Sequence, residues 1–294
     1  MTETLAGLKW GVERRLEFIE FRLFWEGGVN RSDIIDMFDV SVPQASKDLT
    51  LYQERAPHNA IYDKSAKRYV ASEHFEPHFL KPSPDGYLSR LRSVAEGLID
   101  LPDSWITQVP ETDIALTPRR DVDAGVLRAM LGAVRSGRLI EVRYQSMSKG
   151  RPDPVWRCIT PHAFGYDGFR WHARAYCHLT DKFKDFLLPR ILGIGELGEA
   201  GADAKQDALW QERFGVEIGP HPELTASQKA VVAKDYGMEG GSAVLTVRYA
   251  MLFYVLKRLG LLGDAAKQPA RSQHIVVVNR TETQAALERA DFAA

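Results

Sequence analysis

The chain has 294 residues, which exceeds the size of one ordinary domain, so we expect two or three domains. Hydrophobic residues make up 45% and charged residues 26% of the chain, values typical of a folded protein rather than a disordered one. The formal net charge of −1 excludes a chain that is basic throughout, so any binding of nucleic acid must depend on local patches. Positive charge is concentrated in residues 138–194, with ten Lys or Arg against five acids, whereas residues 1–75 hold ten basic and twelve acidic side chains.

The two cysteines, Cys158 and Cys177, have neither the spacing of metal ligands nor that of a disulfide framework. This usage is typical of a reducing compartment, and both are expected to be small buried residues. The sequence starts without a charged-then-apolar signal, and apolar runs such as 250–256 are far too short to span a bilayer. We therefore expect a soluble, cytoplasmic protein with no membrane partner, no metal and no other cofactor.

The N-terminal residues 1–78 have the pattern of a winged helix-turn-helix domain. Apolar residues recur at helical spacing from Leu16 to Phe24, and a second helix is expected to begin near Asn30. Ser41 can cap a third helix, which has a proline in its first turn. Two short apolar arms within residues 60–70 flank a polar turn, which predicts a β-hairpin.

A domain of this class places its third helix in the major groove of DNA, where residues at the N-terminal end face base edges. Side chains of the hairpin are expected to contact phosphates, which supply position and affinity rather than sequence information. The predicted DNA-binding residues are Pro43, Gln44, Ser46 and Lys47 on the helix, and Lys64, Lys67 and Arg68 on the hairpin. A helix-turn-helix used for protein contacts is the alternative, which the excess of acids in residues 1–75 leaves open.

The rest of the chain divides into three segments. Residues 79–120 contain several prolines and one expected helix, so we assign them as a helical linker or dimerisation region. Residues 121–205 begin with an amphipathic helix that ends at Gly137 and continue as five short strands, which predicts a small β-barrel. The expected strands are 139–145, 155–160, 163–166, 169–176 and 185–192.

The last segment, residues 206–294, alternates helices with strands and is expected to be a small α+β domain. Its expected elements are a helix at 227–235, a strand at 243–249, a helix at 251–262 and a strand at 274–279. The fold class expected for the whole chain is therefore a multidomain α+β protein.

Residues 170–176, Arg-Trp-His-Ala-Arg-Ala-Tyr, alternate in chemistry at every position. In a strand, Trp171, Ala173 and Ala175 would pack inward together, because successive side chains point to opposite faces. The opposite face would carry Arg170, His172, Arg174 and Tyr176. Such a row suits an anionic ligand, since the guanidinium fork matches phosphate and carboxylate oxygens. An ordinary solvated strand face is the alternative.

Four motifs give the chain a resemblance to a known family. They are Ile140 to Ser146 (IEVRYQS), Arg157 to His162 (RCITPH), Arg170 to Tyr176, and Phe186 to Ile191 (FLLPRI). In order and spacing they resemble the WYL-domain transcriptional regulators, in particular the winged-helix type associated with bacterial anti-phage defence, the BrxR and CapW group. The resemblance covers nearly the whole chain. It departs from the family at the Trp-Tyr-Leu triplet, because Trp171-His172-Ala173 stand there.

The resemblance implies an Sm-like or SH3-like five-stranded β-barrel that senses a ligand, often nucleic acid such as single-stranded DNA. It also implies a homodimeric repressor of a phage-defence operon, bound to a palindromic double-stranded operator until a nucleic-acid or nucleotide ligand arrives. The family's ligand-facing positions map onto Tyr144, Ser146, His162, His172, Arg174 and Arg190, to which the strand pattern adds Arg170. Arginine and histidine suit phosphates and bases, and serine offers a hydroxyl. Tyr144 lies on the apolar side of its own strand, so a core position is the alternative for it.

Two other classes of function compete with a regulator. Gly193, Gly195 and Gly198 form the G-x-G-x-x-G pattern of a dinucleotide-binding loop, but Glu196 and Glu199 would oppose a pyrophosphate. The chain lacks H-E-x-x-H, C-x-x-C and P-loop motifs, and its basic middle lacks the carboxylate cluster of a metal-dependent nuclease. The favoured interpretation is therefore a regulator and not an enzyme. The alternative is a nucleic-acid-processing enzyme or an RNA-binding adaptor built on the barrel.

Overall fold

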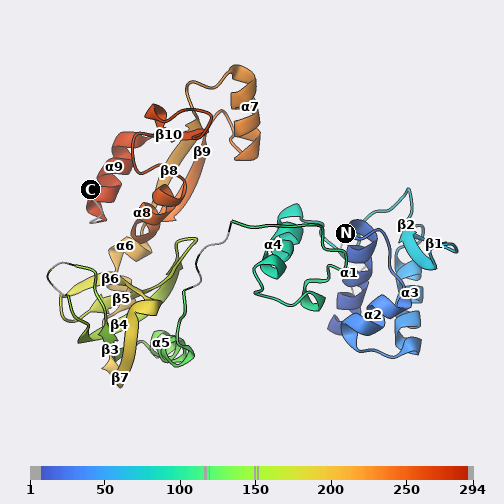
Figure 1. The fold of residues 1–294 in the computed structure, drawn as a ribbon, viewed down its shortest axis with the longest axis horizontal. Coiled ribbons are helices and arrows are strands. Elements are labelled where there is room, and N and C mark those ends of the chain that lie inside the picture. Colours follow the sequence, from blue (N-terminus) through green and yellow to red (C-terminus); the bar gives the residue numbers. More distant parts are fainter. Residues whose placement is uncertain (1–7, 116–117, 119, 149, 151, 291–294) are drawn as a thin grey trace. The chain divides into compact units, whose positions relative to one another are not determined.

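The structure is a computed structural model, and it describes residues 8–290 except 116, 117, 119, 149 and 151. The chain forms two compact units that divide after residue 117. The first unit contains helices α1 to α4 and a β-hairpin, and the second contains a five-stranded sheet and a three-stranded sheet with their helices (Figure 1).

The first unit has the helices and hairpin of a winged helix. Its elements are α1 (Trp10–Trp25), α2 (Arg31–Phe38), α3 (Val42–Arg55), β1 (Ala60–Asp63), β2 (Arg68–Ala71), α4 (Pro84–Ala95) and a 3-10 turn at Pro102–Ser104. Both expected helix starts are confirmed, because Asn30 forms a capping box with Asp33 on α2 and the Ser41 hydroxyl caps α3. A backbone bridge between Val29 and Tyr69 ties the hairpin to the residues that precede α2. The hairpin is therefore held beside the helices as a wing.

The connection between α1 and the wing requires a glycine at residue 28. Gly28 has a φ of +152°, a conformation that L side chains rarely adopt. A Cβ at this position would lie 2.6 Å from the carbonyl oxygen of Tyr69. That carbonyl accepts a 2.8 Å hydrogen bond from the Val29 amide, so moving it would break the bridge. The close approach of the two backbones thus depends on the absence of a side chain.

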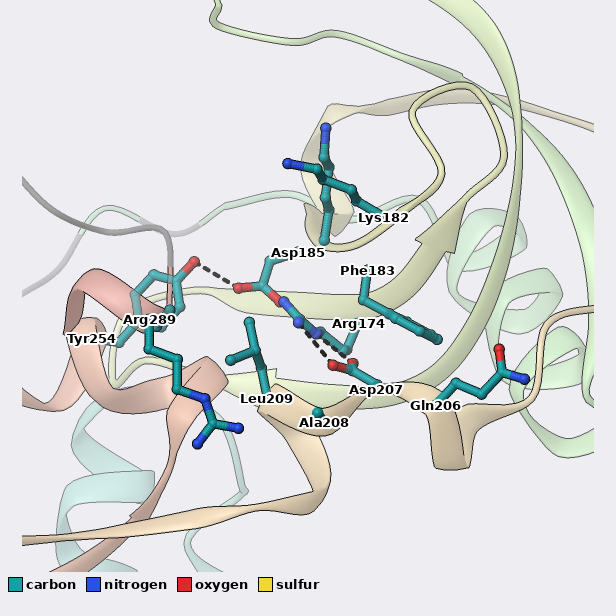
Figure 2. Close-up of a pocket in the computed structure, with 12 residues that line it drawn as sticks. Arg174, Lys182, Phe183, Asp185, Gln206, Asp207, Ala208, Leu209, Tyr254 and Arg289 are labelled. Atoms are coloured by element: carbon teal, nitrogen blue, oxygen red, sulfur yellow. Dashed lines mark hydrogen bonds and ion pairs between the residues drawn. The ribbon is translucent and has the colours of Figure 1, made fainter. Parts of the chain in front are cut away.

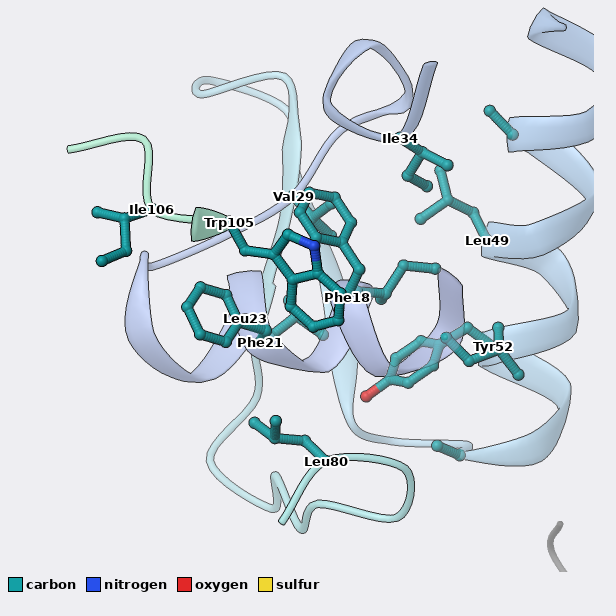
Figure 3. Close-up of a cluster of buried hydrophobic side chains, with 14 of the residues drawn as sticks. Phe18, Phe21, Leu23, Val29, Ile34, Leu49, Tyr52, Leu80, Trp105 and Ile106 are labelled. Carbon is teal, nitrogen blue, oxygen red and sulfur yellow. The ribbon is translucent and has the colours of Figure 1, made fainter. Parts of the chain in front are cut away.

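The hydrophobic core of the first unit includes residues from well beyond the wing (Figure 3). The ring of Trp105 meets Phe18 and Phe21 edge to face, with centroids 5.5 and 5.6 Å apart. Glu20 of α1 is fully buried and accepts hydrogen bonds from the backbone amides of residues 78–80. Residues 79–106 therefore pack onto the winged helix. A dimerisation role for residues 79–120 stays a prediction, as do the domain boundaries.

The second unit begins with a helix and a five-stranded antiparallel sheet. Its elements are α5 (Ala124–Ser136), β3 (Arg138–Tyr144), β4 (Val155–Tyr166), β5 (Trp171–Cys177), β6 (Lys182–Leu187), a 3-10 turn at Leu188–Arg190 and β7 (Ile191–Ala200). The strand order is β6-β5-β4-β3-β7. Residues 155–166 form one strand with an irregular register at Pro161–Ala163, where the sequence pattern predicts two strands. The strand predicted at 185–192 is divided between β6 and β7, and β7 continues to residue 200.

The five-stranded sheet is not closed into a barrel, so the expectation of a closed barrel is wrong. Among the described residues, β6 pairs with β5 and β7 pairs with β3, and no ladder joins β6 to β7. The chain passes between these edges through a 3-10 turn in which Pro189 has no amide hydrogen to donate. At the end of β6, the Leu187 amide donates to the Tyr144 hydroxyl at 3.2 Å rather than to a neighbouring strand. An Sm-like topology stays a prediction.

The C-terminal part of the second unit is a three-stranded sheet with its helices. Its elements are a 3-10 turn (Ala204–Gln206), α6 (Ala208–Gln211), β8 (Arg213–Pro220), α7 (Ala226–Asp235), β9 (Ala243–Arg248), α8 (Tyr249–Arg258), a 3-10 turn (Ala265–Lys267), β10 (Ile275–Val277) and α9 (Arg280–Arg289). Strand β8 lies between β10 and β9, and both pairings are antiparallel. The four predicted elements are present, whereas β8 and α9 lie outside the prediction.

Candidate functional site

The predicted DNA-binding residues lie on two adjacent elements of the first unit, the start of α3 and the wing. We call them the recognition surface: Pro43, Gln44, Ser46, Lys47, Lys64, Lys67 and Arg68. Pro43, Lys47, Lys64 and Lys67 are exposed, and Gln44, Ser46 and Arg68 are half-buried. The Gln44 amide donates to the Asp48 carboxylate at 3.0 Å, and Asp48 in turn pairs with Arg15 at 2.6 Å. Gln44 is therefore positioned by its own helix, whereas Lys47 projects from α3.

The tip of the wing is ordered by Asp63. Its carboxylate accepts hydrogen bonds from the Ser65 hydroxyl and from the backbone amides of Ser65 and Ala66. These bonds, led by the one from the Ser65 hydroxyl, lower the pKa of Asp63. The turn presents Lys64 and Lys67 outward. Arg68 differs from them, because its Nε atom is buried without a hydrogen-bond partner among the described residues.

A cavity of about 670 Å³ lies between the start of α2, helix α3 and the wing. The residues that line it are Asn30, Arg31, Ser32, Ser46, Leu49, Thr50, Tyr62, Lys67 and Tyr69. Arg31 and Tyr62 are exposed, and Arg31 approaches the Ser46 hydroxyl at 3.4 Å. Neither residue is among the DNA-binding residues predicted from the sequence. The position of Arg31, directly after the Asn30 cap, is the signal that could have identified it, because the first turn of α2 lies beside α3 in this fold.

The acids of the first unit do not cancel the charge of the recognition surface, because several are buried in internal contacts. Glu20 binds backbone amides, and Asp48 pairs with Arg15. Burial opposes ionisation of Glu26, but hydrogen bonds from the Thr107 side chain and amide and from Gln108 outweigh it and lower its pKa. These three acids are therefore held in internal contacts, two of them beside Arg15 and Arg22, and they do not face a ligand at the surface of this unit.

In the second unit, the alternating heptapeptide of β5 is only partly placed as its pattern predicts. Ala173 and Ala175 are fully buried, as expected. Trp171 is 52% exposed, so its inward position is wrong. It begins the strand beside the turn into β5, where its ring lies against Tyr166 with centroids 4.8 Å apart. His172 and Arg174 are only 3% and 4% exposed, so the face that carries them is not a solvated row of cations.

Arg174 is the centre of a buried network that we call the ion-pair cluster, formed by His162, Arg174, Asp185, Asp207 and Tyr254. The Asp207 carboxylate accepts hydrogen bonds from the Arg174 Nε and Nη2 atoms at 2.7 and 3.0 Å. Asp185 accepts from Nη1 at 3.1 Å on the other side of the guanidinium, and from the Tyr254 hydroxyl at 3.0 Å (Figure 2). His162 lies 3.0 Å from Asp207 through its Nε2 atom.

The cluster holds the Asp207 carboxylate ionised despite its burial. Burial raises the pKa of Asp207, but hydrogen bonds from His162 and Arg174 outweigh it and bring the pKa to about 2. Burial lowers the pKa of Arg174, but Asp207 and Asp185 outweigh it and raise that pKa. Burial and the charge of Asp185 together raise the pKa of Tyr254. Arg174 therefore carries a full positive charge that two internal acids already neutralise.

A second, smaller group of ion pairs lies at the turn that leads into β5. Asp167 accepts from the Arg170 Nε atom at 3.0 Å and lies 3.1 Å from the His172 Nε2 atom. Burial raises the pKa of Asp167, but His172, Arg170 and two backbone amides lower it to about 2. The His172 ring packs against Tyr254 with centroids 4.7 Å apart. His172 is therefore held between the sheet and helix α8.

The remaining predicted ligand residues lie near the 3-10 turn between β6 and β7. Tyr144 is a core residue, with its ring edge to face with Phe186 at 4.9 Å. The Ser146 hydroxyl is 3.0 Å from that of Ser148. Arg190 is half-buried, and its side chain has no ion pair among the described residues. A backbone hydrogen bond joins the segment that follows β3 to the 3-10 turn, because the Gln145 amide donates to the Arg190 carbonyl at 3.0 Å.

The ligand residues predicted from the sequence do not include Asp185, Asp207 and Tyr254, which complete the ion-pair cluster. Asp185 lies in the register position opposite Arg174 on β6, a pairing that the strand pattern could have indicated. Asp207 is the N-cap of α6, and Tyr254 lies on α8. Both come from the C-terminal part of the chain, so no local pattern connects them with β5.

The G-x-G-x-x-G pattern is a strand and not a nucleotide-binding loop. Gly193, Gly195 and Gly198 all lie in β7. A Cβ on Gly195 would lie 2.3 Å from a carboxylate oxygen of Glu141, and one on Gly198 would lie 3.0 Å from Leu139. These glycines therefore allow side chains of β3 to cross the neighbouring strand.

The described residues provide neither a metal-binding group nor a helix able to span a membrane. They contain no group of three or more His, Cys, Asp or Glu side chains placed to hold a metal ion. None of the helices in the described part of the chain has the length and apolar character needed to cross a bilayer. Cys177 is buried as expected, whereas Cys158 is half-buried.

Three family models match the chain in order along its length. The BrxR transcriptional regulator winged helix-turn-helix domain matches residues 11–93, and the WYL domain matches residues 125–195. The BrxR transcriptional regulator C-terminal dimerization domain matches residues 213–283. Together with the fold, these matches define the class of the protein as a winged-helix regulator with a WYL domain.

Relatives over nearly the full length share one name, DNA-binding transcriptional repressor CapW. The one from Stenotrophomonas maltophilia is 40% identical over 276 residues, which cover 94% of this chain and 92% of the relative. The relative from Pseudomonas aeruginosa is 38% identical over 278 residues, with the same coverage, and that from Escherichia coli is 37% identical over 286 residues, or 96% and 94%. The chain therefore belongs to the CapW family, and these names confirm the expectation of a regulator rather than an enzyme.

Among solved structures, the proteasome accessory factor B/C of Arthrobacter aurescens is a match that covers 95% of this chain and 48% of the chain of that protein. Its sequence identity is 18% and the TM-score is 0.23. A TM-score of this size supports no structural argument.

Proposed function

We propose that the chain is a DNA-binding transcriptional repressor, as the names of its relatives state of them. The observation that carries the proposal is the recognition surface. An exposed lysine near the start of α3 and two exposed lysines on the wing lie on the two elements that a winged helix applies to a groove and to the backbone of DNA. A repressor of this kind acts beside the chromosome, so the proposed location is the cytoplasm.

The repressor is proposed to act as a homodimer on a palindromic operator. Support comes from the match of residues 213–283 to a domain described as a dimerization domain. Two winged helices related by a two-fold axis read half-sites related by the same axis, so a palindrome is the expected form of the operator.

Binding of the full-length protein to the DNA upstream of its own gene tests this proposal. We expect a sequence-specific, salt-sensitive shift, and Lys47→Ala weakens it by about tenfold, the discrimination of one good base contact. Lys81→Ala is the matched control, because Lys81 is an exposed lysine of the same unit outside the recognition surface. If Lys47→Ala binds the operator as tightly as the unsubstituted protein, the assignment of α3 as the recognition helix is wrong. Hydrolysis of the nucleic acid would instead indicate an enzyme.

The operator affinity is proposed to be controlled by an anionic nucleic-acid or nucleotide ligand at the WYL domain, in a repressor of a phage-defence operon. Support for a ligand comes from the match to the WYL domain and from Arg190, a half-buried guanidinium without an ion pair among the described residues. Because no ion pair among the described residues neutralises this guanidinium, it is available to an external anion. Arg174 differs from Arg190, because Asp185 and Asp207 already neutralise its charge.

The ligand proposal is tested by adding a short single-stranded oligonucleotide to the protein–operator complex. We expect the operator to be released from the unsubstituted protein but retained by Arg190→Ala, while basal operator binding stays the same. Arg135→Ala, which removes an exposed arginine from α5, is the control and keeps the response. A full response of Arg190→Ala would contradict the assignment of this residue.

A further inference from the structure

The pairing between Arg174 and Asp207 has the geometry with which an arginine holds a phosphate. Two donors of one edge of the guanidinium, Nε and Nη2, meet the two oxygens of the carboxylate at 2.7 and 3.0 Å. Phosphate is held by the same planar fork of parallel hydrogen bonds. His162 adds a third contact at 3.0 Å to one of these oxygens. Arg174 and His162 of the sheet thus contact one carboxylate at three points.

The anionic group does not belong to the sheet that binds it. Asp207 lies 33 residues after Arg174 and caps α6, at the start of the C-terminal part of the unit. It is only 1% exposed, so its carboxylate is held where solvent hardly reaches. By contrast, Asp185 is the direct neighbour of Arg174 on β6 and moves with the sheet. Asp207 is therefore the member of the cluster that can leave without unfolding a strand.

A cavity of about 520 Å³ opens beside this carboxylate. Its charged lining residues are Arg174, Asp207, Arg289 of α9, and Lys182, Lys184 and Asp185 of β6. Figure 2 shows Asp207, Gln206 and Leu209 along one side of the cavity and Arg289 near the end of α9. Phosphate groups in this cavity would have Lys182 and Lys184 within the same lining as the Arg174 guanidinium. The lining holds four cations and two acids, although Arg289 also pairs with Glu212. The space and this excess of cations suit an oligoanion larger than a carboxylate.

We propose that Asp207 is a built-in substitute for a phosphate of the ligand. Its carboxylate stays bound to Arg174 and His162 until a nucleic-acid phosphate replaces it. The inference rests on the proposed ligand control of this domain and adds the exchange by which that control works. Entry of the phosphate breaks the two hydrogen bonds between Arg174 and Asp207 and forms two from Arg174 to phosphate oxygens. The Asp207 carboxylate becomes free to turn into solvent.

The exchange has a direct consequence for the C-terminal part of the unit. The Asp207 carboxylate also accepts from the Trp210 amide at 3.3 Å, so its movement loosens the cap of α6. Trp210 packs against His162 with ring centroids 5.9 Å apart, and its carbonyl accepts a hydrogen bond from Arg248 of β9. These contacts connect the cluster to β9, which lies in the segment matched to the dimerization domain. The domain then has two arrangements, one with Asp207 bound to Arg174 and one with Asp207 released. A ligand that binds the released arrangement more tightly shifts the equilibrium toward it by the difference between its two affinities.

A purely structural role for Asp207 is the competing explanation, and the charge of this residue separates the two. Asp207→Asn keeps the size of the side chain and its ability to cap a helix but removes the negative charge that competes with phosphate. Under either explanation, this change weakens the contact between residue 207 and Arg174. If Asp207 is only structural, the affinity for the ligand falls or stays constant. If Asp207 takes the place of a phosphate, the affinity for the ligand rises.

The test compares the binding of fluorescent single-stranded hexathymidylate by the full-length protein and by Asp207→Asn. We expect the affinity of the variant to be higher by about tenfold or more, because a larger fraction of molecules is competent to bind. Asp264→Asn is the matched control, since it removes an equal charge from a surface ion pair with Arg280 and leaves the affinity unchanged. Equal, weaker or undetectable binding by Asp207→Asn overturns the proposal.

A second measurement uses the unsubstituted protein and does not depend on the folding of the variant. Hydrogen exchange in a peptide covering residues 204–212 is expected to accelerate when hexathymidylate is bound, because the cap of α6 is released. Unchanged or slower exchange in this peptide at saturation overturns the exchange mechanism. If the oligonucleotide releases the operator but neither expected result is seen, ligand control stands and the exchange fails. If the operator is bound but the oligonucleotide has no effect on any variant, both fail.

Discussion

The recognition surface of the first unit and the ion-pair cluster of the second contain similar cations in opposite environments. Lys47, Lys64 and Lys67 are exposed, whereas Arg174 is 4% exposed and bonded to two carboxylates. Exposed lysines keep their hydration and can neutralise DNA phosphates by releasing counterions. A buried arginine has lost its hydration, so its charge is costly without an anionic partner. The first surface is therefore ready for its ligand, and the second must exchange one anion for another.

This difference shows that a row of basic residues in a sequence does not reveal whether its charge is available. What distinguishes the two sites is whether an acid binds the cations directly. In the first unit, Glu20 binds backbone amides and Asp48 pairs with Arg15, so neither acid is bound to the exposed lysines. In the cluster, Asp207 and Asp185 both pair with Arg174.

The comparison is tested most strongly by removing an acid from the cluster entirely. Asp207→Ala leaves Arg174 and His162 with one fewer anion in a buried site, which we expect to cost about 3–5 kcal/mol in the free energy of unfolding. Lys47→Ala, on the exposed surface, should change it by less than about 0.5 kcal/mol. Urea denaturation of the full chain measures both. Similar effects of the two substitutions would erase the distinction between the sites.

Acid should act on the cluster in a defined pH range. The pKa of Asp207 is about 2 in the folded protein against an ordinary value of 3.8, so the unfolded chain binds the proton more readily. The stability that this carboxylate contributes is complete above about pH 4 and is lost as the pH falls to about 2, a change on the order of 2 kcal/mol. Urea denaturation at pH 6 and pH 3 should therefore show that Asp207→Asn loses less free energy of unfolding between these pH values than the unsubstituted protein. An identical pH dependence of the two proteins would contradict the assigned charge.

The recognition surface should respond to salt where the cluster does not. Lys64→Ala on the wing is expected to reduce the slope of log affinity against log salt for duplex DNA by about 1 and to weaken all sequences alike. The free energy of unfolding should stay nearly constant, because Lys64 is exposed. Lys81→Ala serves as the control for general charge. A Lys64→Ala protein with an unchanged salt slope would exclude the wing from phosphate contact.

Much of the fold could be predicted because its signals are local. The caps at Asn30 and Ser41 and the apolar spacing of α1 determine where the first helices begin. The α9 helix was missed because its sequence, rich in Thr, Gln, Glu and Arg, shows little apolar periodicity. The closed barrel was wrong because strand count alone does not decide whether two edge strands pair, and here a proline-containing turn lies between them.

The sequence by itself determined the winged helix and the order of the three matched domains, because capping, periodicity and motif spacing act between residues close in the chain. Only the tertiary structure decided the state of the cations of β5. Trp171 is exposed and Arg174 is buried because neighbours from β4, β6, α6 and α8 set their surroundings. Burial and charge pairing depend on residues that meet in space, and the contact between Arg174 and Asp207 forms only when the C-terminal part of the chain packs against the sheet.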